Sequence, residues 1–432
     1  MTITVSYIDQ LLTFKSLTMK KWSILCLLAI SFIFSGCLKD EIKKSYTFYR
    51  PVYKTSEQVR LDIKSSDPVS VNNPGKLFYR NGYVFLNEIN KGVHIIDIST
   101  PSKPKVVAFV KIPGAVDLAV RSNILYADMY TDLVAIDISD PLDIKLSSVV
   151  EGVFPQRYYM DFYADTSKVI VDWVRVDTTV KSTDETSTWG MMRADAFLAS
   201  NTAASPSSGS KSSNGVGGSM ARFALSNDRL YTVDYSMIKV FNTSDAAKPS
   251  FVKEVQTQSW NIETIFPFAD HLFIGSMTGM LIFDISSKDN PVAAGSFDHA
   301  RVCDPVISDG NYAYVTLRGG SKCQGFLNQM DVLDISDVTK PKLVQSYQMT
   351  NPRGLSKDGN ILLICDGDDG LRIMDATSAT AVGQLSLLKM STTFDVIAIG
   401  GIAIVSAMDG LYLVDYSQPA NPVITGSIKL SN

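Results

Sequence analysis

Short apolar stretches separated by turn-forming residues run along most of the chain. Residues 116–150 show the pattern, since VDLAVRSN, ILYADMY, LVAIDIS and IKLSSVV each have the composition of a strand and turn formers lie between them. No amphipathic helical period interrupts these strands. Four short strands in about 40 residues are typical of one β-propeller blade, and the pattern excludes solenoids built from helices.

The third strand of each unit ends on a short polar side chain, which recurs every 40 to 50 residues apart from one longer gap. These residues are Asp97, Asp137, Asn242, Asp284, Asp334, Asp375 and Asp415. A side-chain oxygen at this place can accept a hydrogen bond from a backbone N–H one or two residues later and close an Asx-type turn. The single Asn does this as well as Asp, because the turn needs an acceptor and no charge. We therefore predict that all seven are structural turn anchors, and we assign no catalytic residue.

The repeat breaks between Asp137 and Asn242, which lie 105 residues apart. A degenerate unit within this gap supplies part of a blade. The predicted fold is all-β: a single propeller over residues 73–430 with about eight four-stranded blades, or seven if the partial unit is appended to a neighbour. Residues 181–219 form an insertion that is Ser/Gly-rich in its second part, and we expect it to be mobile because such a segment cannot bury a core.

The repeats at 134–141 (VAIDISDP), 281–291 (LIFDISSKDNP) and 332–341 (VLDISDVTKP) resemble those of the LVIVD-repeat family of exported β-propellers. The resemblance covers roughly residues 73–430. It implies a propeller lipoprotein of bacterial, Bacteroidota-like type with no established activity, so it is specific for the fold and weak for function.

The N-terminal region has the features of an export signal. After Met19 come two lysines, an apolar run over residues 22–34 and then small residues before Cys37. The run is shorter than the ~20 residues of a membrane-spanning helix. We predict a signal peptide in residues 1–36, with Met19 as the true start, and a tether and N-terminal extension in residues 37–72.

Residues 34–37, FSGC, resemble the lipobox of bacterial lipoproteins, which implies lipidation of Cys37. The following LKDE resembles the acidic tag of surface-exported lipoproteins. A plain secretory signal with a chance cysteine is the alternative. The expected location is the outer membrane, either at the cell surface or facing the periplasm, with membrane contact through the lipid only.

Composition limits the partners. The chain has a formal net charge of −4 and 19% charged residues, so it lacks the basic excess of a nucleic-acid-binding protein. We predict no nucleic-acid partner and no cofactor. The expected partner is a protein or glycan of the cell envelope.

Cysteine spacing fits an exported protein. Cys303 and Cys323 lie within one repeat and form the candidate disulfide, whereas Cys365 lies in the apolar run ILLIC and is expected to be a buried thiol. No C-x-x-C pair occurs, so no metal site is predicted.

A charged residue recurs about 20 residues before each anchor, where the innermost strand of each blade should begin. The residues found in this way are Lys76, Asp117, Arg222, Glu263, Arg353 and Asp395, with Asp304 and Asp161 at less regular distances. Propellers bind ligands at the mouth of the central channel, and a ring of both charge signs there suits a polar ligand. The alternative is that these side chains only solvate the channel and neutralise each other.

The densest polar cluster is FDHARVCDP, with His299, Arg301 and Asp304. A histidine near a carboxylate can act as an acid–base pair, although hydrogen bonds that hold a loop would explain it equally. CDGDDGL at 365–371 superficially resembles a calcium loop but lacks the required spacing, and it stands where other units have a hairpin turn.

Several aromatic residues could stack on sugar rings or pack between blades: Tyr158, Tyr159, Trp173, Trp189 and Trp260. The leading hypothesis is a lipid-anchored propeller that binds a partner at the channel mouth without catalysis. The alternatives are an envelope hydrolase or lyase at the same place and a structural or adhesion lipoprotein that acts through its outer faces.

Overall fold

The computed structural model describes residues 43–157, 159, 167–181, 192–193, 216–299, 305–320 and 326–430. The chain divides into two compact units, one made of residues 1–50 and 175–194 and the other of residues 51–174 and 195–432. None of the helices in the described residues has the length and apolar character needed to cross a bilayer.

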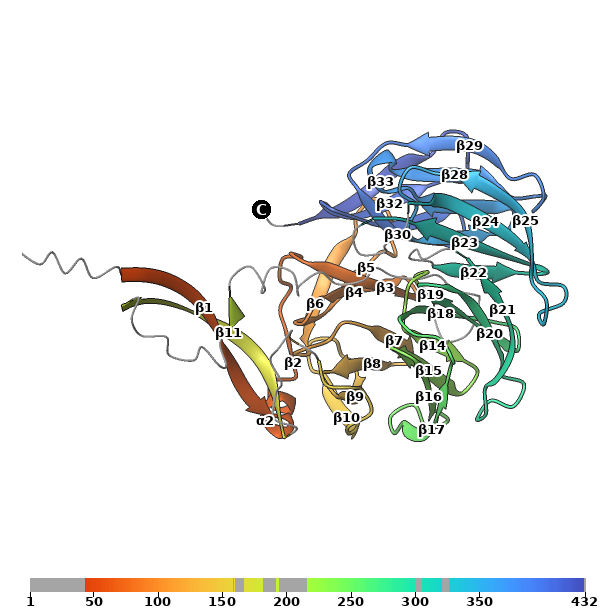
Figure 1. Ribbon diagram of the computed structural model, residues 1–432. Coiled ribbons are helices and arrows are strands. Elements are labelled where there is room, and N and C mark those ends of the chain that lie inside the picture. The colour runs from red at the N-terminus through yellow and green to blue at the C-terminus, as the bar shows by residue number, and fades with distance from the viewer. Residues whose placement is uncertain are drawn as a thin grey trace, which may run out of the picture. The chain divides into compact units, whose positions relative to one another are not determined.

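The larger unit is a propeller of seven four-stranded antiparallel blades (Figure 1). Blade 1 is made of β3 (Pro74–Arg80), β4 (Tyr83–Glu88), β5 (Gly92–Asp97) and β6 (Lys105–Lys111). Blade 2 is made of β7 (Leu118–Arg121), β8 (Ile124–Met129), β9 (Asp132–Asp137) and β10 (Lys145–Val150). Blade 3 is made of β14 (Phe223–Ser226), β15 (Arg229–Asp234), β16 (Met237–Asn242) and β17 (Ser250–Gln256). Each blade is thus one continuous segment of the chain.

The remaining four blades follow the same order. Blade 4 is made of β18 (Ile262–Phe268), β19 (His271–Ser276), β20 (Gly279–Asp284) and β21 (Val292–Asp298). Blade 5 is made of β22 (Val306–Asp309), β23 (Tyr312–Arg318), β24 (Asn328–Asp334) and β25 (Lys342–Gln348). Blade 6 is made of β26 (Leu355–Asp358), β27 (Ile361–Cys365), β28 (Leu371–Asp375) and β29 (Gly383–Leu388), with the 3-10 turn η1 (Gly367–Asp369). Blade 7 is made of β30 (Thr393–Ile399), β31 (Ile402–Ala407), β32 (Gly410–Asp415) and β33 (Val423–Lys429).

Blade 1 carries three additions. The short strand β13 (Val216–Gly217) pairs with β3 at the inner edge, and β2 (Lys64–Ser66) pairs with β6 at the outer edge. The helix α2 (Ser56–Arg60) precedes β2 and begins with a capping box on Thr55. Residues before the first repeat therefore extend an outer edge that would otherwise expose unpaired backbone groups.

The smaller unit explains the break in the repeat. Its described residues belong to a three-stranded sheet in the order β11–β1–β12, formed by β1 (Lys43–Thr55), β11 (Lys168–Lys181) and β12 (Met192–Arg193). Within this unit the Thr47 hydroxyl donates a hydrogen bond of 2.6 Å to Asp177. The degenerate unit is therefore not a blade, and the preference for eight blades is corrected to the seven-blade alternative, because its strand pairs with β1.

Burial follows the stacking of the blades. The third strands are buried on both faces, as in β9, whereas fourth strands such as β33 alternate between exposed and partly buried positions. This is expected where each sheet is covered on both sides except at its outer edge. The cluster that joins blades 7 and 1 contains Leu77, Leu86, Ile404 and Leu413, all at most 1% exposed. The strands of blade 7 and those of blade 1 form separate sheets, so no blade combines strands from both ends of the propeller. Side-chain packing therefore closes the ring here.

Each of the seven anchor side chains accepts a hydrogen bond from the backbone N–H two residues later, at 2.7–2.9 Å. This is the geometry of an Asx-type turn. The backbone N–H of Ser99, for example, lowers the pKa of Asp97. The anchored turns position the contacts between blades, because the chain that follows lies against the preceding blade. Tyr126 of blade 2 donates to the Ala246 carbonyl at 2.7 Å, and Tyr231 of blade 3 donates to the Lys288 carbonyl at 2.8 Å.

Candidate functional site at the channel mouth

The innermost strands form a closed ring around the propeller axis. Successive first strands contact each other in the order β3, β7, β14, β18, β22, β26 and β30, and β30 returns to β3. The six regularly spaced charged residues, Lys76, Asp117, Arg222, Glu263, Arg353 and Asp395, lie in these strands or within two residues of their starts. Counting back from the anchors thus finds residues at one end of the channel.

Three of these residues form a buried cluster. Lys76, Asp117 and Asp395 are 2%, 1% and 0% exposed. The Lys76 ammonium lies 3.9 Å from Asp117 Oδ2 and donates a hydrogen bond of 2.7 Å to the Met220 carbonyl. Asp117 also accepts from the backbone N–H groups of Leu118 and Arg222, at 2.7 and 2.6 Å. These side chains therefore belong to the interior and do not face an incoming ligand.

A segment of the insertion fills the channel beside this cluster. Residues 216–222, which we call the channel segment, include β13 and follow the Ser/Gly-rich stretch. The Ser219 hydroxyl accepts from the Leu355 N–H at 2.7 Å and donates to Asp395 Oδ1 at 3.4 Å, and the Ile265 N–H donates to the Ala221 carbonyl at 2.9 Å. Ser219 is fully buried. Small residues at 216–219 thus lie between converging first strands and satisfy their polar groups. The mobility expected for residues 181–219 stays a prediction.

Burial shifts the protonation equilibria of the cluster. It lowers the pKa of Lys76 to about 8, against the opposing effect of the Asp117 carboxylate. Burial also raises the pKa of Asp117 and raises that of Asp395 well above its ordinary value. Two carboxyl groups share one ammonium, so the cluster favours a form with fewer charges than free side chains would have.

Partly exposed charged residues surround this interior. Glu263, Arg318 and Arg353, which we call the rim cluster, are each partly exposed. The Arg353 guanidinium lies 4.8 Å from the centre of the Phe394 ring, and its Nε has no hydrogen-bond partner in the part of the chain that the structure describes. Burial lowers the pKa of Arg353, and the neighbouring Arg318 charge lowers it further. Two cations and one carboxylate at this rim favour an acidic group on a ligand.

Counting from the anchors misses Arg318, because it ends the second strand of blade 5 and does not precede a first strand. Its pKa is lowered by burial and is raised in part by Glu263, which places the two side chains in one electrostatic environment. The sequence feature that could have indicated Arg318 is the RGG at residues 318–320, where the connection to the third strand of blade 5 begins.

The other predicted site residues are only partly described. His299 is partly buried, and its backbone N–H donates to the Thr278 carbonyl at 3.2 Å. The remaining predicted residues lie outside the described part of the chain: Cys37, Asp161, Arg301, Cys303, Asp304 and Cys323. Cys365 is a buried free thiol with a pKa raised by burial.

The acidic loop after β27 forms a hairpin turn. Asp366 is fully buried, accepts from the Asn351 N–H at 2.7 Å and pairs with Arg372 Nε at 2.5 Å. Asp369 pairs with Lys389 at 2.5 Å and with Arg372 at 3.0 Å. Donors of the chain itself thus occupy these carboxylates. Among the described residues, no group of three or more His, Cys, Asp and Glu side chains could hold a metal ion.

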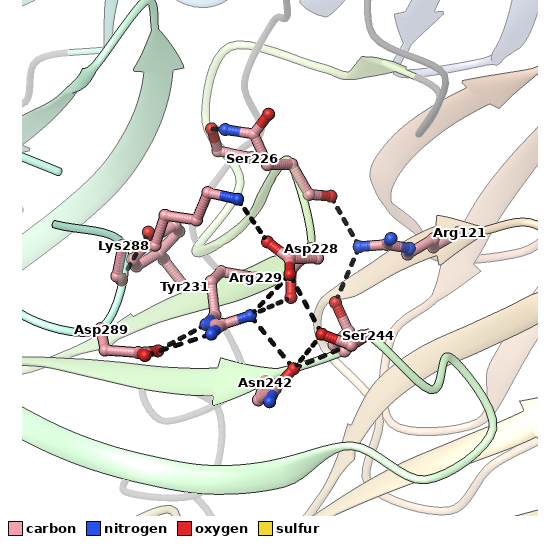
Figure 2. A network of polar contacts seen from close by, with 11 residues as sticks. Arg121, Ser226, Asp228, Arg229, Tyr231, Asn242, Ser244, Lys288 and Asp289 are labelled. Carbon is pink, nitrogen blue, oxygen red and sulfur yellow. Dashed lines mark hydrogen bonds and ion pairs between the residues drawn. The ribbon is translucent and has the colours of Figure 1, made fainter. Parts of the chain in front are cut away.

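A second polar network lies at the anchor end of blade 3 (Figure 2). Arg229 pairs with Asp289 at 2.5 Å and with Asp228 at 3.0 Å, and its Nη1 donates to the Asn242 side chain at 3.1 Å. A hydrogen bond from Lys288 is the largest of the effects that hold the pKa of Asp228 far below its usual range. Two carboxylates already neutralise Arg229, so the neutral amide at this anchor supplies an acceptor without a third negative charge. The network joins neighbouring blades and has a structural role.

Four stretches of the chain match the LVIVD repeat, at residues 80–111, 114–151, 302–349 and 392–429. They fall on blades 1, 2, 5 and 7. Among curated proteins, no sequence relative is found.

Solved structures show similarity at low sequence identity. The computationally designed Ika8 protein has 11% identity and a TM-score of 0.49, with 84% of this chain and 92% of that chain covered. A protein from Lactobacillus plantarum has 14% identity and a TM-score of 0.49, with coverages of 82% and 98%. AztD from Citrobacter koseri has 13% identity and a TM-score of 0.37, with coverages of 48% and 61%. Similarity at this level carries no functional argument.

Proposed function

We propose that this propeller, which carries LVIVD repeats, is a lipid-anchored binding scaffold of the cell envelope that captures a protein or glycan partner at the channel mouth. The observation that carries the proposal is the rim cluster of Glu263, Arg318 and Arg353, which stays partly exposed above a buried cluster and a filled channel. The filled channel favours a ligand that rests on the rim over one that enters the axis.

The chemistry of the rim cluster defines the part of the partner that it would contact. Two guanidinium groups next to one carboxylate favour a carboxylate or phosphate group, which can accept paired hydrogen bonds from a planar guanidinium. The Arg318 and Arg353 side chains, which are each partly exposed, would donate these hydrogen bonds.

Partner capture tests this proposal. We expect the Arg318→Ala/Arg353→Ala variant to capture about tenfold less of its partner from native envelope extract than the wild type, since a hydrogen bond to a charged group contributes roughly 1.5–3 kcal/mol. Captured material would be quantified by mass spectrometry after crosslinking. The matched control is Lys105→Ala/Lys145→Ala, which removes the same charge at exposed positions of the anchor end.

Equal capture by both double variants would exclude the rim cluster as the binding site. Capture that depends on the rim and is followed by cleavage of the captured component would replace the scaffold with a hydrolase or lyase. Partner capture that survives the rim variant but is lost when outer faces are changed would favour the adhesion alternative.

The anchor is tested separately. The sequence FSGC and the LKDE that follows support lipidation of Cys37. We expect incorporation of a palmitate analogue in the native host to be lost completely in Cys37→Ala, because no other residue would carry the lipid. Protease treatment of intact cells then reports which side of the outer membrane the propeller faces. Unchanged labelling of Cys37→Ala would contradict the anchor without affecting the rim cluster.

A further inference from the structure

Two exposed aromatic rings touch each other at the mouth end of blades 3 and 4. Trp260 lies in the connection from β17 to β18 and is 63% exposed, and Tyr235 lies in the turn from β15 to β16 and is 55% exposed. Their ring centroids are 5.7 Å apart and the ring planes meet at 71°. Single exposed apolar residues are common on protein surfaces, but two rings in contact form a continuous apolar platform.

The connection that carries Trp260 holds a defined and unusual conformation. Gln258 and Asn261 have φ values of 63° and 56°, in the left-handed region that residues other than glycine seldom adopt. Hydrogen bonds fix the connection, since the Thr257 hydroxyl donates to the Ser236 carbonyl at 2.9 Å and Met277 N–H donates to the Asn261 carbonyl at 3.3 Å. A connection held in this way presents its side chains in a fixed orientation.

A groove of about 470 Å³ begins next to this platform. This volume lies within the ~300–1,000 Å³ range of small-molecule sites. Its polar lining includes Gln258, Ser259 and Thr278 near the platform, and its apolar lining includes Leu281 and Phe283 from β20. The groove therefore combines hydroxyl and amide groups with a limited apolar wall.

The charge of the lining restricts the ligand. Among the described residues that line the groove, Asp298 is the single charged one. A phosphate or a nucleic acid would need cations, and the described part of the lining offers none. A neutral ligand rich in hydroxyl groups fits the hydrogen-bonding side chains and can also donate to the Asp298 carboxylate.

We propose that the Trp260–Tyr235 platform and the adjoining groove bind a neutral saccharide chain. A pyranose ring has a face of C–H groups that packs on an aromatic ring, while its hydroxyl groups require hydrogen-bond partners at the ring edge. The platform supplies the aromatic ring, and the groove supplies the hydrogen-bond partners. None of the three rim-cluster residues is among the described residues that line the groove, so binding here does not depend on the function proposed above.

Binding of defined oligosaccharides to the purified full-length protein tests this inference. Calorimetric titrations would use the neutral hexamers of glucose with β-1,3, β-1,4 and α-1,4 linkages, of xylose and of N-acetylglucosamine, together with an anionic galacturonic acid hexamer. We expect at least one neutral hexamer to bind. Trp260→Ala should lower its affinity about tenfold or more, the size of effect that loss of an aromatic contact produces, and Trp260→Phe should retain most of it.

The control variants separate the groove from other surfaces. Phe251→Ala removes a ring that is 44% exposed on β17 but does not line the groove, and it should leave affinity unchanged. Arg353→Ala should also leave it unchanged. Thermal unfolding of each variant confirms that the fold is kept. Binding of no neutral hexamer, binding of the galacturonic acid hexamer alone, or unchanged affinity in Trp260→Ala would each overturn the inference.

Discussion

Replacing Lys76 by methionine is expected to lower the free energy of unfolding by about 3–5 kcal/mol at pH 7, because removing one partner leaves a buried charge without compensation. Lys76 is 2% exposed and lies 3.9 Å from Asp117. Without the ammonium, Asp117 and Asp395 remain buried together in the channel. Denaturation by urea measures the change. Lys288→Met is the control, since Lys288 pairs with Asp228 but is 45% exposed, and loss of an exposed pair costs about 0–1 kcal/mol.

The cost of Lys76→Met should also depend on pH. Burial raises the pKa of Asp395 in the folded protein well above its ordinary value of 3.8, so the folded protein keeps a proton that the unfolded chain releases. Its contribution to stability is therefore present in acid and is lost as the pH rises from about 4 through the folded pKa. The Lys76 charge lowers the pKa of both buried carboxyl groups, so its removal should cost less at pH 4 than at pH 7. An equal cost at both pH values would assign the effect of Lys76 to packing alone.

Replacing Gly426 by alanine is expected to destabilise the contact between blades 7 and 1 by about 1–3 kcal/mol, the usual cost of an extra methyl group in a filled space. A Cβ at Gly426 would lie 2.2 Å from the Pro101 carbonyl oxygen and 2.7 Å from the Pro104 ring. Both contacts belong to the turn that follows the Asp97 anchor. A backbone carbonyl and a proline ring cannot move aside by a change of rotamer, so the contacts would have to be relieved by a shift of the backbone. Thermal unfolding measures the loss.

Two other glycines test whether this contact is a general feature of the propeller. Gly295 of blade 4 has the same relation to blade 5, since its Cβ would lie 2.0 Å from the Val338 carbonyl oxygen, and Gly295→Ala should be similarly costly. Gly383 of blade 6 has no atom within 4 Å of such a Cβ, so Gly383→Ala should change stability by less than about 0.5 kcal/mol. If all three variants unfold at the wild-type temperature, the anchored turns do not limit the spacing of blades.

The repeating parts of the fold could be predicted because seven copies of one pattern support each other. Asn242 was especially informative, since its neutral side chain indicated a turn rather than chemistry. The number of blades could not be predicted in the same way. The strand at residues 168–181 has the apolar alternation of a blade strand, and only its partner β1 shows that it lies outside the blades. Local periodicity predicts a strand but not its pairing partner.

The candidate site could likewise be predicted only in part. Counting back from the anchors located the channel residues because every blade keeps its first strand at a similar distance from its third. Burial of Lys76 and Asp395 could not be predicted, because the channel segment comes from a Ser/Gly-rich insertion whose composition suggested mobility. Trp260 illustrates the same limit. An aromatic side chain at this position fitted both packing between blades and stacking on sugar. Its exposure is a property of the folded connection.

The channel segment also constrains the order in which the propeller can form. Ser219 bonds to Leu355 and Asp395, which lie 136 and 176 positions later in the sequence. During synthesis these bonds cannot form until blades 6 and 7 have left the ribosome, although blades 1 and 2 already precede the segment. Contacts between such distant positions are slow to form because a long loop must close first. The hydrogen bonds along the propeller axis therefore form last. The channel segment is synthesised well before blade 7, but it is held in place only when that blade is complete.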